Sequence, residues 1–303
     1  MKILITGSNG IIGRQILKEL IINYPNSDIY TVNRTLINNQ NERVYSLKLD
    51  ILNADENAII SLFKKIQPVI FFHLAWDTSH SDYLTNSNNV KWENQSKIMI
   101  HSFYSSGGKR FVGIGSSIEY DWKEPTPFVE FKTKMGGNGW LYGLSKLNVA
   151  KYLESLHNIS YLWCRVFFVF GPYQNSSRLI PLVIHNTLGE KSQLSLNLEL
   201  KRDYLSTFEI AKQIIMMQKT DYSGPVNICS GKGTEIKEIV NIITDLLDKK
   251  INLSNLKYED KFEIDNLYGS TQIFKKYFEN YTYSQNDFKR DMQKTLEYYL
   301  SEV

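Results

Sequence analysis

Two residues four positions apart, Tyr142 and Lys146, are suited to acid–base chemistry. They open a stretch with helical spacing that runs to about Leu156, and residues four apart lie on one face of a helix. A free tyrosine has a pKa of roughly 10, so its phenol is protonated at neutral pH. A neighbouring ammonium group favours the phenolate, and a shift of about 3 units corresponds to about 4 kcal/mol. The spacing therefore predicts that Tyr142 exchanges a proton with a carbonyl or alcohol oxygen.

Two serines, Ser116 and Ser117, follow a short apolar stretch with the pattern of a strand, residues 110–114. A hydroxyl at the end of a strand is able to hydrogen-bond a substrate oxygen and polarise it. The alternative is that both hydroxyls only satisfy loop backbone groups. Because these serines coincide with Tyr142 and Lys146, the set favours a catalytic site made of Ser116, Tyr142 and Lys146, with Ser117 beside the substrate.

A glycine-rich turn, residues 7–13, links the first predicted strand, residues 2–6, to the first predicted helix. Gly7 suits a tight turn, Gly10 lets backbone N–H groups approach a pyrophosphate, and Gly13 allows close packing of helix on strand. Between a strand and a helix, such a turn predicts a dinucleotide site more than an ordinary turn. The predicted contacts are Gly7, Ser8, Asn9, Gly10, Ile11 and Ile12.

The ends of the next strands complete this predicted site. The second strand ends in Asn33 and Arg34 with no carboxylate, which favours NADP over NAD because an arginine pairs with a 2′-phosphate. The alternative is that Arg34 is only solvated. Asp50 and Ile51 suit an adenine pocket, although Asp50 equally suits a helix N-cap. The backbone of Leu74 and Ala75 is expected to line the cofactor.

The elements that must hold these residues alternate between short β-rich runs and helical patterns. This alternation predicts βαβ units, and residues 69–74, apolar on both faces, predict a strand inside a parallel sheet. Helices are expected at residues 58–66 and 90–106. The predicted fold class is α/β, a Rossmann-type doubly wound parallel sheet with a smaller mixed α/β C-terminal substrate domain. We expect the dinucleotide domain to span 1–171, with a segment near 203–230 returning to it, and the smaller domain to span 172–303.

Composition excludes several classes of protein. The 303 residues suffice for about two domains, and no apolar run approaches the roughly 18 residues of a membrane span. A net charge of +3, spread along the chain, argues against a nucleic-acid partner. Only two cysteines, Cys164 and Cys229, are present, and no histidines stand at metal-binding spacing, so neither a disulfide framework nor a metal site is expected. With no signal-peptide pattern at the N-terminus, the expected compartment is the cytoplasm.

Taken together, the motifs resemble the extended short-chain dehydrogenases/reductases, in the branch of NAD(P)-dependent sugar-nucleotide epimerases and dehydratases. The resemblance covers nearly the whole chain. It rests on the glycine turn, the Ser116 strand, residues 73–75, 142–146, 170–172, 202–204 and 227–231, and Arg165.

The resemblance implies a role for each matched residue. Tyr142 is then the general acid/base, Lys146 binds the nicotinamide ribose and lowers the pKa of Tyr142, and Ser116 holds the reacting sugar hydroxyl or ketone. It also implies that Asn94 supports the site from the long helix and that Arg202 grips the diphosphate of a nucleotide-sugar substrate.

Three further expectations concern the surroundings of the site. Arg178 is a second candidate for the phosphates or a solvated residue, and Trp76 lines the sugar pocket or only covers the sheet edge. A homodimer through helices 90–106 and 142–156 is what the resembled family implies.

Departures from the family's sub-patterns bear on the reaction. The 4,6-dehydratases have an Asp-Glu pair where this chain has Ser117 and Ile118, and fucose-type epimerase-reductases have a base cysteine in place of Ile118. We therefore predict an NAD(P)H-dependent reductase of a 4-keto-6-deoxy sugar nucleotide, in which hydride goes to C4. The alternatives are a 4-epimerase with retained NAD and a non-catalytic dinucleotide-binding sensor. Epimerases commonly carry Asn where this chain has Phe168.

Overall fold

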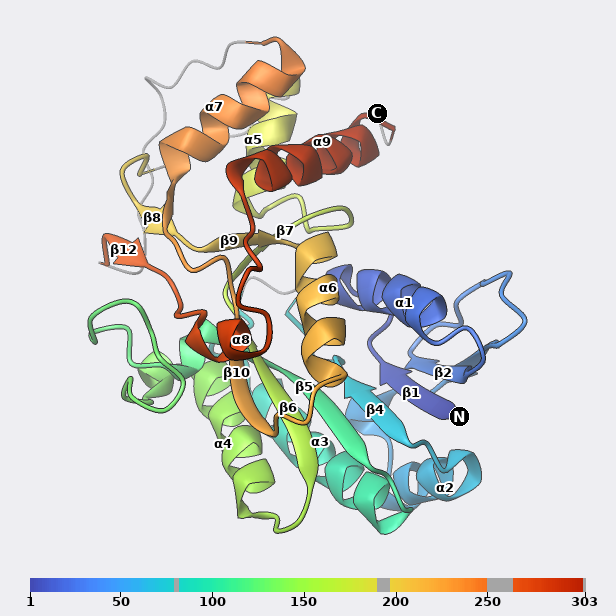
Figure 1. The fold of residues 1–303 in the computed structure, drawn as a ribbon. Coiled ribbons are helices and arrows are strands. Elements are labelled where there is room, and N and C mark those ends of the chain that lie inside the picture. Colours follow the sequence, from blue (N-terminus) through green and yellow to red (C-terminus); the bar gives the residue numbers. More distant parts are fainter. Residues whose placement is uncertain (79–81, 190–196, 250–263, 302–303) are drawn as a thin grey trace.

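The computed structural model describes residues 1–78, 82–189, 197–249 and 264–301 (Figure 1). Its centre is a sheet of seven parallel strands in the order β10-β6-β5-β4-β1-β2-β3. The strands are β1 (Lys2–Thr6), β2 (Asp28–Asn33), β3 (Val44–Lys48), β4 (Ile70–His73), β5 (Arg110–Ser116), β6 (Ser160–Val166) and β10 (Gly224–Ile228). The strand order reverses between β1 and β4, and the crevice at the carboxyl ends of these two strands is where ligands bind in such sheets. The predicted doubly wound Rossmann-type fold is confirmed.

Helices cover both faces of this sheet (Figure 1). On one face lie α1 (Ile11–Asn23) and α6 (Thr207–Gln218), and on the other lie α2 (Glu56–Ile66), α3 (Asn88–Ser105) and α4 (Leu141–Ser155). Successive residues of a strand point to opposite faces, so Ile3 and Ile5 pack with α1 and α6 whereas Leu4 packs with the other three helices. Both layers are therefore built from alternate side chains of the same apolar strands.

The helix bounds differ slightly from the sequence prediction. α2 begins two residues earlier than expected because the side chain of Asp55 caps it, accepting a hydrogen bond from the Ala58 N–H at 2.8 Å. α3 runs two residues further toward the N-terminus than the predicted 90–106 and ends one residue earlier. The apolar pattern locates helix interiors well, whereas the caps decide where helices end.

Beyond residue 171 the chain forms further helices and mostly very short strands, and β7 (Phe168–Phe170) comes just before that point. The later ones are α5 (Leu179–Leu188), β8 (Lys201–Arg202), β9 (Tyr204–Ser206), β11 (Thr234–Glu235), α7 (Ile236–Leu247), β12 (Asn266–Leu267), α8 (Gln272–Tyr277) and α9 (Gln285–Ser301). Three of the helices, α5, α7 and α9, gather at one end of the molecule around a separate apolar core that includes Ile184, Ile239 and Met292 (Figure 1). The chain also returns to the main body here, since β10 pairs with β6 and α6 packs on α1. The domain limits stay predictions.

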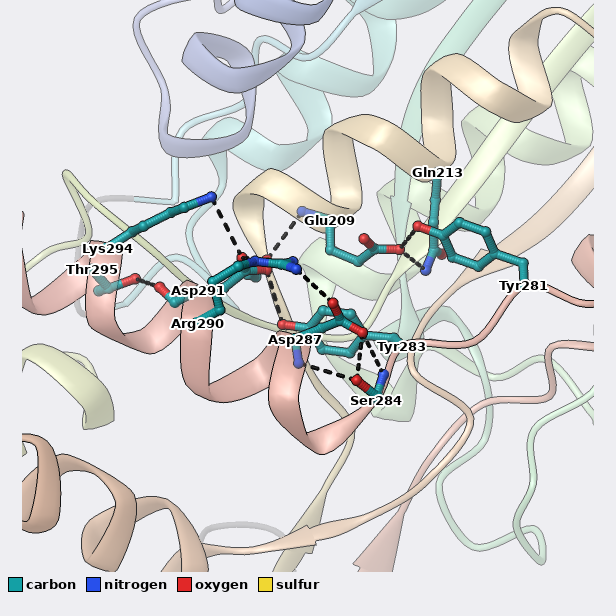
Figure 2. Close-up of polar contacts among 11 residues, drawn as sticks. Glu209, Gln213, Tyr281, Tyr283, Ser284, Asp287, Arg290, Asp291, Lys294 and Thr295 are labelled. Atoms are coloured by element: carbon teal, nitrogen blue, oxygen red, sulfur yellow. Dashed lines mark hydrogen bonds and ion pairs between the residues drawn. The ribbon is translucent and has the colours of Figure 1, made fainter.

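A buried carboxylate joins α9 to the start of α6 (Figure 2). Asp291, whose side chain is 2% exposed, accepts hydrogen bonds from the hydroxyls of Ser206 at 2.5 Å and Tyr283 at 3.1 Å. Ser206 in turn caps α6 by accepting from the Glu209 N–H at 3.0 Å. The helix α9 is thus tied to α6, one of the helices that cover the sheet.

No helix within the described ranges combines the length and apolarity of a membrane span.

Candidate active site

The structure brings Ser116, Tyr142 and Lys146 together. β5 ends at Ser116, Tyr142 lies in the first turn of α4, and Lys146 lies one turn further along the same face. The side chain of Ser116 acts on Tyr142 and works to lower its pKa. The Lys146 Nζ lies 5.9 Å from the centroid of the Tyr142 ring and donates to the Ile114 carbonyl at 2.8 Å. A hydroxyl, a phenol and an amine therefore share one edge of the sheet.

Tyr142 is enclosed by aromatic rings. Its ring meets those of Trp76 and Tyr83 edge to face, with centroids 6.1 and 5.3 Å away, and the residue is only 8% exposed. Burial raises its pKa well above the ordinary range, and the nearby Tyr83 and Glu119 raise it further, whereas Ser116 and Arg178 lower it. In the protein alone, burial outweighs the groups that lower this pKa, and the lowering expected from Lys146 stays a prediction. Tyr142 is held as a protonated phenol.

Lys146 responds to burial in the opposite direction. Burial lowers the pKa of Lys146 to about 7, because a low-dielectric surrounding disfavours the ammonium, and the negative charge of Glu119 works against that lowering. Lys146 therefore gains and loses its charge near neutral pH.

Glu119 is a residue of the site that sequence reasoning missed. It has no exposed surface, and it accepts hydrogen bonds from the Ser116 N–H at 2.8 Å, the Trp163 indole N–H at 3.0 Å and the Arg165 Nε at 2.8 Å. With Ser116 it forms a capping box around the short helix η2 (Ser117–Glu119). A Cβ on Gly115 would stand 2.5 Å from the Glu119 carboxylate, so this strand position has room only for glycine. The available signal was the Ser-x-x-Glu spacing of a capping box.

The glycine-rich turn is built for a close approach of backbone. Gly7 has a φ of +71°, and a Cβ there would lie 2.7 Å from the Ala75 nitrogen, so the turn packs directly against the chain after β4. A Cβ on Gly13 would lie 2.1 Å from the Gly7 carbonyl oxygen. Gly10, which precedes α1, offers no capping side chain, and the first N–H groups of a helix have no partner within it. The turn with Ser8, Asn9, Ile11 and Ile12 fits a dinucleotide pyrophosphate.

The side-chain amide of Asn33, at the end of β2, contacts this turn. Asn33, 6% exposed, donates from Nδ2 to the Ser8 hydroxyl at 2.8 Å and accepts from the Asn9 N–H at 3.4 Å. Arg34 is exposed beside it. The amide places no negative charge where an adenosine ribose is expected, which suits either a hydroxyl or a phosphate at the 2′ position.

The remaining predicted cofactor contacts vary in how well they are placed. Leu74 and Ala75 are half-buried after β4, and the Ala75 N–H donates to the Thr6 hydroxyl at 3.3 Å. Ile51 is buried in the apolar core that it shares with residues of α2 and α3. Asp50 is exposed and makes no capping bond to η1 (Ile51–Asn53), but accepts from the Asn53 side chain at 2.7 Å.

His73, at the end of β4, is structural. Its Nε2 faces the Ser96 hydroxyl at 2.8 Å, and since that hydroxyl donates to the Trp92 carbonyl, Nε2 carries the hydrogen and Nδ1 accepts from Thr6. Burial lowers its pKa to about 3, so His73 is neutral. Within the described part of the chain no group of three or more His, Cys, Asp or Glu side chains is arranged to hold a metal ion.

The structure does not bring Asn94 to the site, because it lies on an exposed position of α3. Asn89, five residues earlier, is 2% exposed and accepts a hydrogen bond from the Trp76 indole N–H at 2.8 Å. The asparagine behind the site is thus Asn89.

The predicted substrate contacts are distributed around Tyr142 and beyond it. Trp76 contacts Tyr142 and Lys146 rather than standing apart on the sheet edge. The Arg178 guanidinium lies 4.9 Å from the centroid of Tyr83 and donates to the Thr78 carbonyl at 3.1 Å. Arg202 is 3% exposed, and its Nη1 donates to the Lys201 and Ile264 carbonyls, both at 2.8 Å. Ser117 is buried.

Fold and site together define a Rossmann-type dinucleotide-binding protein with a Ser-Tyr-Lys set at the carboxyl edge of its sheet. Residues 3–229 match the family model of the NAD dependent epimerase/dehydratase family, and the chain belongs to that family.

Solved structures share the fold over the whole chain. A UDP-N-acetylglucosamine 4-epimerase from Methanobrevibacter ruminantium M1, in complex with UDP-N-acetylmuramic acid, is 24% identical and has a TM-score of 0.85 over 100% of this chain and 99% of that one. The Thermus thermophilus UDP-glucose 4-epimerase in complex with NAD is 15% identical, with a TM-score of 0.83 over 100% of both chains. A dTDP-glucose 4,6-dehydratase from Bacillus anthracis str. Ames in complex with NAD is 19% identical, with a TM-score of 0.80 over 99% of this chain and 97% of that one.

Proposed function

We propose that the chain is a reductase of a nucleotide-linked 4-keto-6-deoxy sugar that uses NADPH, with NADH as the less favoured donor. The reduced nicotinamide supplies a hydride to C4 of the sugar, and every other group that the reaction needs is a side chain of this protein. Membership of the family and the fold of the neighbours support nicotinamide chemistry on a nucleotide sugar.

The observation that carries the proposal is that, among the residues that the structure describes, Tyr142 is accompanied by the Ser116 hydroxyl, the Lys146 amine and the Tyr83 phenol, and the carboxylate of Glu119 is already engaged. Eliminating water or moving a proton at carbon requires an additional acid or base. Glu119 cannot serve, because Arg165, Trp163 and the Ser116 N–H occupy its oxygens in a fully buried position. Residues 117 and 118 are Ser and Ile, which supply no carboxylate. Hydride transfer with a single proton is the reaction that these groups suit.

The protonation state of Tyr142 favours the reductive direction. A ketone that gains a hydride at C4 becomes an alkoxide and must receive a proton on its oxygen, so the residue beside it must start as an acid. Burial keeps Tyr142 as a phenol. Ser116, at the end of β5 and acting on Tyr142, would bond the same oxygen and polarise the carbonyl. After transfer, the phenolate beside the Lys146 ammonium regains its proton from solvent, and the reaction balances.

The cofactor choice rests on the end of β2. Asn33 is neutral and held by Ser8 and Asn9, and the exposed Arg34 follows it, so position 33 presents no carboxylate to a 2′-phosphate and Arg34 brings a cation nearby. Net reductions usually draw on NADPH, which agrees with this preference.

The proposal is tested by adding NADPH to the purified protein with nucleotide-linked 4-keto-6-deoxy sugars. The expected result is a fall in absorbance at the reduced-nicotinamide band together with formation of the 4-hydroxy sugar. If no such sugar produces that fall with either NADPH or NADH, the protein is not this reductase.

A 4-epimerase is the second candidate, because the same Ser116, Tyr142 and Lys146 set is able to oxidise and re-reduce one carbon. An epimerase must return the hydride to the opposite face of the sugar, so the sugar ring must turn over beside Tyr142, whose own ring packs against Trp76 and Tyr83. NAD that remains bound through purification, with interconversion of 4-epimers and no net consumption of cofactor, would favour the epimerase.

Replacing Tyr142 with phenylalanine removes only the proton donor. For Tyr142→Phe we expect turnover to fall by about 10² to 10⁴-fold, the usual contribution of general acid catalysis. Cofactor affinity, measured by fluorescence titration, should stay within a few fold, because the ring still fills its place between Trp76 and Tyr83. Unchanged turnover would remove Tyr142 from the mechanism.

A further inference from the structure

The ammonium of Lys146 rests on the face of an indole. Its Nζ lies 3.8 Å from the ring centroid of Trp76, closer than to the rings of Trp163 at 5.8 Å or Tyr142 at 5.9 Å. A cation over the face of a tryptophan is attracted by the negative charge of the ring's π system, most strongly when the pair is removed from water. Lys146 is 4% exposed, so the contact lies in such a place.

The other groups that face Lys146 provide little compensation for its charge. The Ile114 carbonyl of β5 accepts one hydrogen bond. Glu119 of η2 is the negative charge that acts on Lys146, but its oxygens are paired with Arg165 and Trp163. His73 of β4 is neutral, and Tyr142 of α4 is a phenol. Among the residues described, Lys146 has no carboxylate at ion-pair distance.

The position of the Trp76 ring is fixed by contacts that do not involve Lys146. Its indole N–H donates to the Asn89 Oδ1 at 2.8 Å, and the Asn89 amide nitrogen donates to the carbonyls of Tyr83 at 2.6 Å and Asn86 at 2.9 Å. These bonds determine which way the amide points, so its oxygen must face the indole. The ring also stacks on Trp92, with centroids 6.1 Å apart and planes 24° apart.

We propose that Trp76 is a positioning residue that holds Lys146 as an ammonium beside Tyr142, through a cation–π contact in place of an ion pair. The inference rests on the proposed function only for the use made of Lys146, since the contact itself belongs to the protein without substrate. Trp76 acts through Lys146 and Tyr142 and takes no part in bond making.

The consequence concerns the proton of Lys146. Burial alone favours the neutral amine, and attraction by the indole works against burial. Weakening the π system without changing the volume of the ring should therefore make Lys146 lose its proton at a lower pH. A tryptophan bearing fluorine atoms does this, because fluorine withdraws electron density while the ring keeps almost the same shape and excludes water as before.

The test places mono-, di- and trifluorotryptophan at position 76 alone and follows the ¹³Cε resonance of Lys146 against pH in the whole protein. The resonance is assigned by its loss in Lys146→Arg. We expect the titration midpoint to fall stepwise with each fluorine, by about one pH unit in total, which corresponds to about 1.4 kcal/mol and lies within the range of a cation–π contact.

The matched control places the same analogues at Trp92, which belongs to the same aromatic cluster but is not the ring under Lys146. There the midpoint should stay unchanged. An unchanged midpoint with fluorinated Trp76, or an equal fall with fluorinated Trp92, would overturn the proposal. This readout needs no turnover, so a failure of the proposed reductase to reduce any ketone would leave it unaffected.

A second measurement connects the contact to catalysis. If the protein reduces a 4-keto sugar, the pH above which kcat declines should fall in the same order as the fluorine number at position 76, while KM for the sugar stays constant. A structural defect would instead lower kcat at every pH, and that result would also contradict the proposal.

Discussion

Burial raises the pKa of Tyr142 and lowers the pKa of Lys146, so of the two only Lys146 titrates near neutral pH. Tyr142 keeps its proton at any physiological pH, whereas the pKa of Lys146 lies at about 7. Because the unfolded chain keeps this lysine protonated up to its ordinary pKa of 10.5, folding releases a proton between about 7 and 10.5. Over that range Lys146 makes the folded state more stable as the pH rises.

The rate of ketone reduction should fall as the pH rises through about 7, because Lys146 then loses the charge that stabilises the phenolate left after proton transfer. The measurement is kcat against pH with NADPH at saturation. In Lys146→Arg the side chain stays charged, so a slower enzyme without this decline is expected. A wild-type rate that rises steadily into the alkaline range would contradict the assignment.

Asn33 should decide between the two nicotinamide cofactors. In Asn33→Asp the new carboxylate still accepts from the Asn9 N–H and the Ser8 hydroxyl, so the turn is preserved while a 2′-phosphate is repelled. We expect the ratio of NADPH to NADH affinity to fall by about tenfold, which corresponds to about 1.4 kcal/mol, in fluorescence titrations of both cofactors.

The control for the cofactor test is Arg34→Gln, which removes the cation but adds no carboxylate. It should weaken NADPH and leave NADH unchanged. A wild-type protein that binds NADH more tightly than NADPH would show that the amide and Arg34 do not select the phosphate.

Among the elements, η2 directly follows Ser116, the last residue of β5. Its capping box requires a buried Glu119, and Arg165, 2% exposed, balances that charge from β6. Replacing Glu119 by Gln leaves the guanidinium buried without a counter-charge. We expect Glu119→Gln to lower the free energy of unfolding by about 3 kcal/mol in urea titrations. Glu154→Gln, on an exposed position of α4, should change it by less than about 0.5 kcal/mol. Equal stability of the two variants would mean that the ion pair contributes nothing.

The elements also mark how far the sequence alone leads. The alternation of apolar runs was sufficient to predict the parallel sheet and the positions of Ser116, Tyr142 and Lys146, because these depend on local pattern. The resemblance points to Asn94, but Asn94 is exposed and the buried Asn89 bonds Trp76, and the polar residues of α3 do not mark which face is buried. The contacts of Glu119 with Arg165 and of Trp76 with Lys146 join residues distant in sequence, and the local pattern gives no measure of such distances.

At the scale of the whole molecule, α9, which shares an apolar core with α5 and α7, is joined to the start of α6 by polar contacts. Asp291 of α9 accepts a hydrogen bond from Ser206, the residue that caps α6, and α6 packs with α1 against the sheet. Tyr283 and Arg290 also bond this carboxylate. Removing it leaves buried donors without a partner, at about 1 to 3 kcal/mol for each group left unsatisfied.

Asp291→Ala should therefore weaken the contact between α9 and α6 more than it affects the cofactor site. We expect the free energy of unfolding to fall by about 3 kcal/mol, and hydrogen exchange to accelerate first in α9 and in the first turn of α6. NADPH affinity should stay within a few fold, because the glycine turn precedes α1 and does not contact Asp291. The KM for the sugar should rise if the elements after residue 171 bind the sugar. Glu297→Ala, on an exposed position of α9, is the control and should alter none of these. Exchange that accelerates equally in β1 and β4 would show that the two parts unfold as a single cooperative unit.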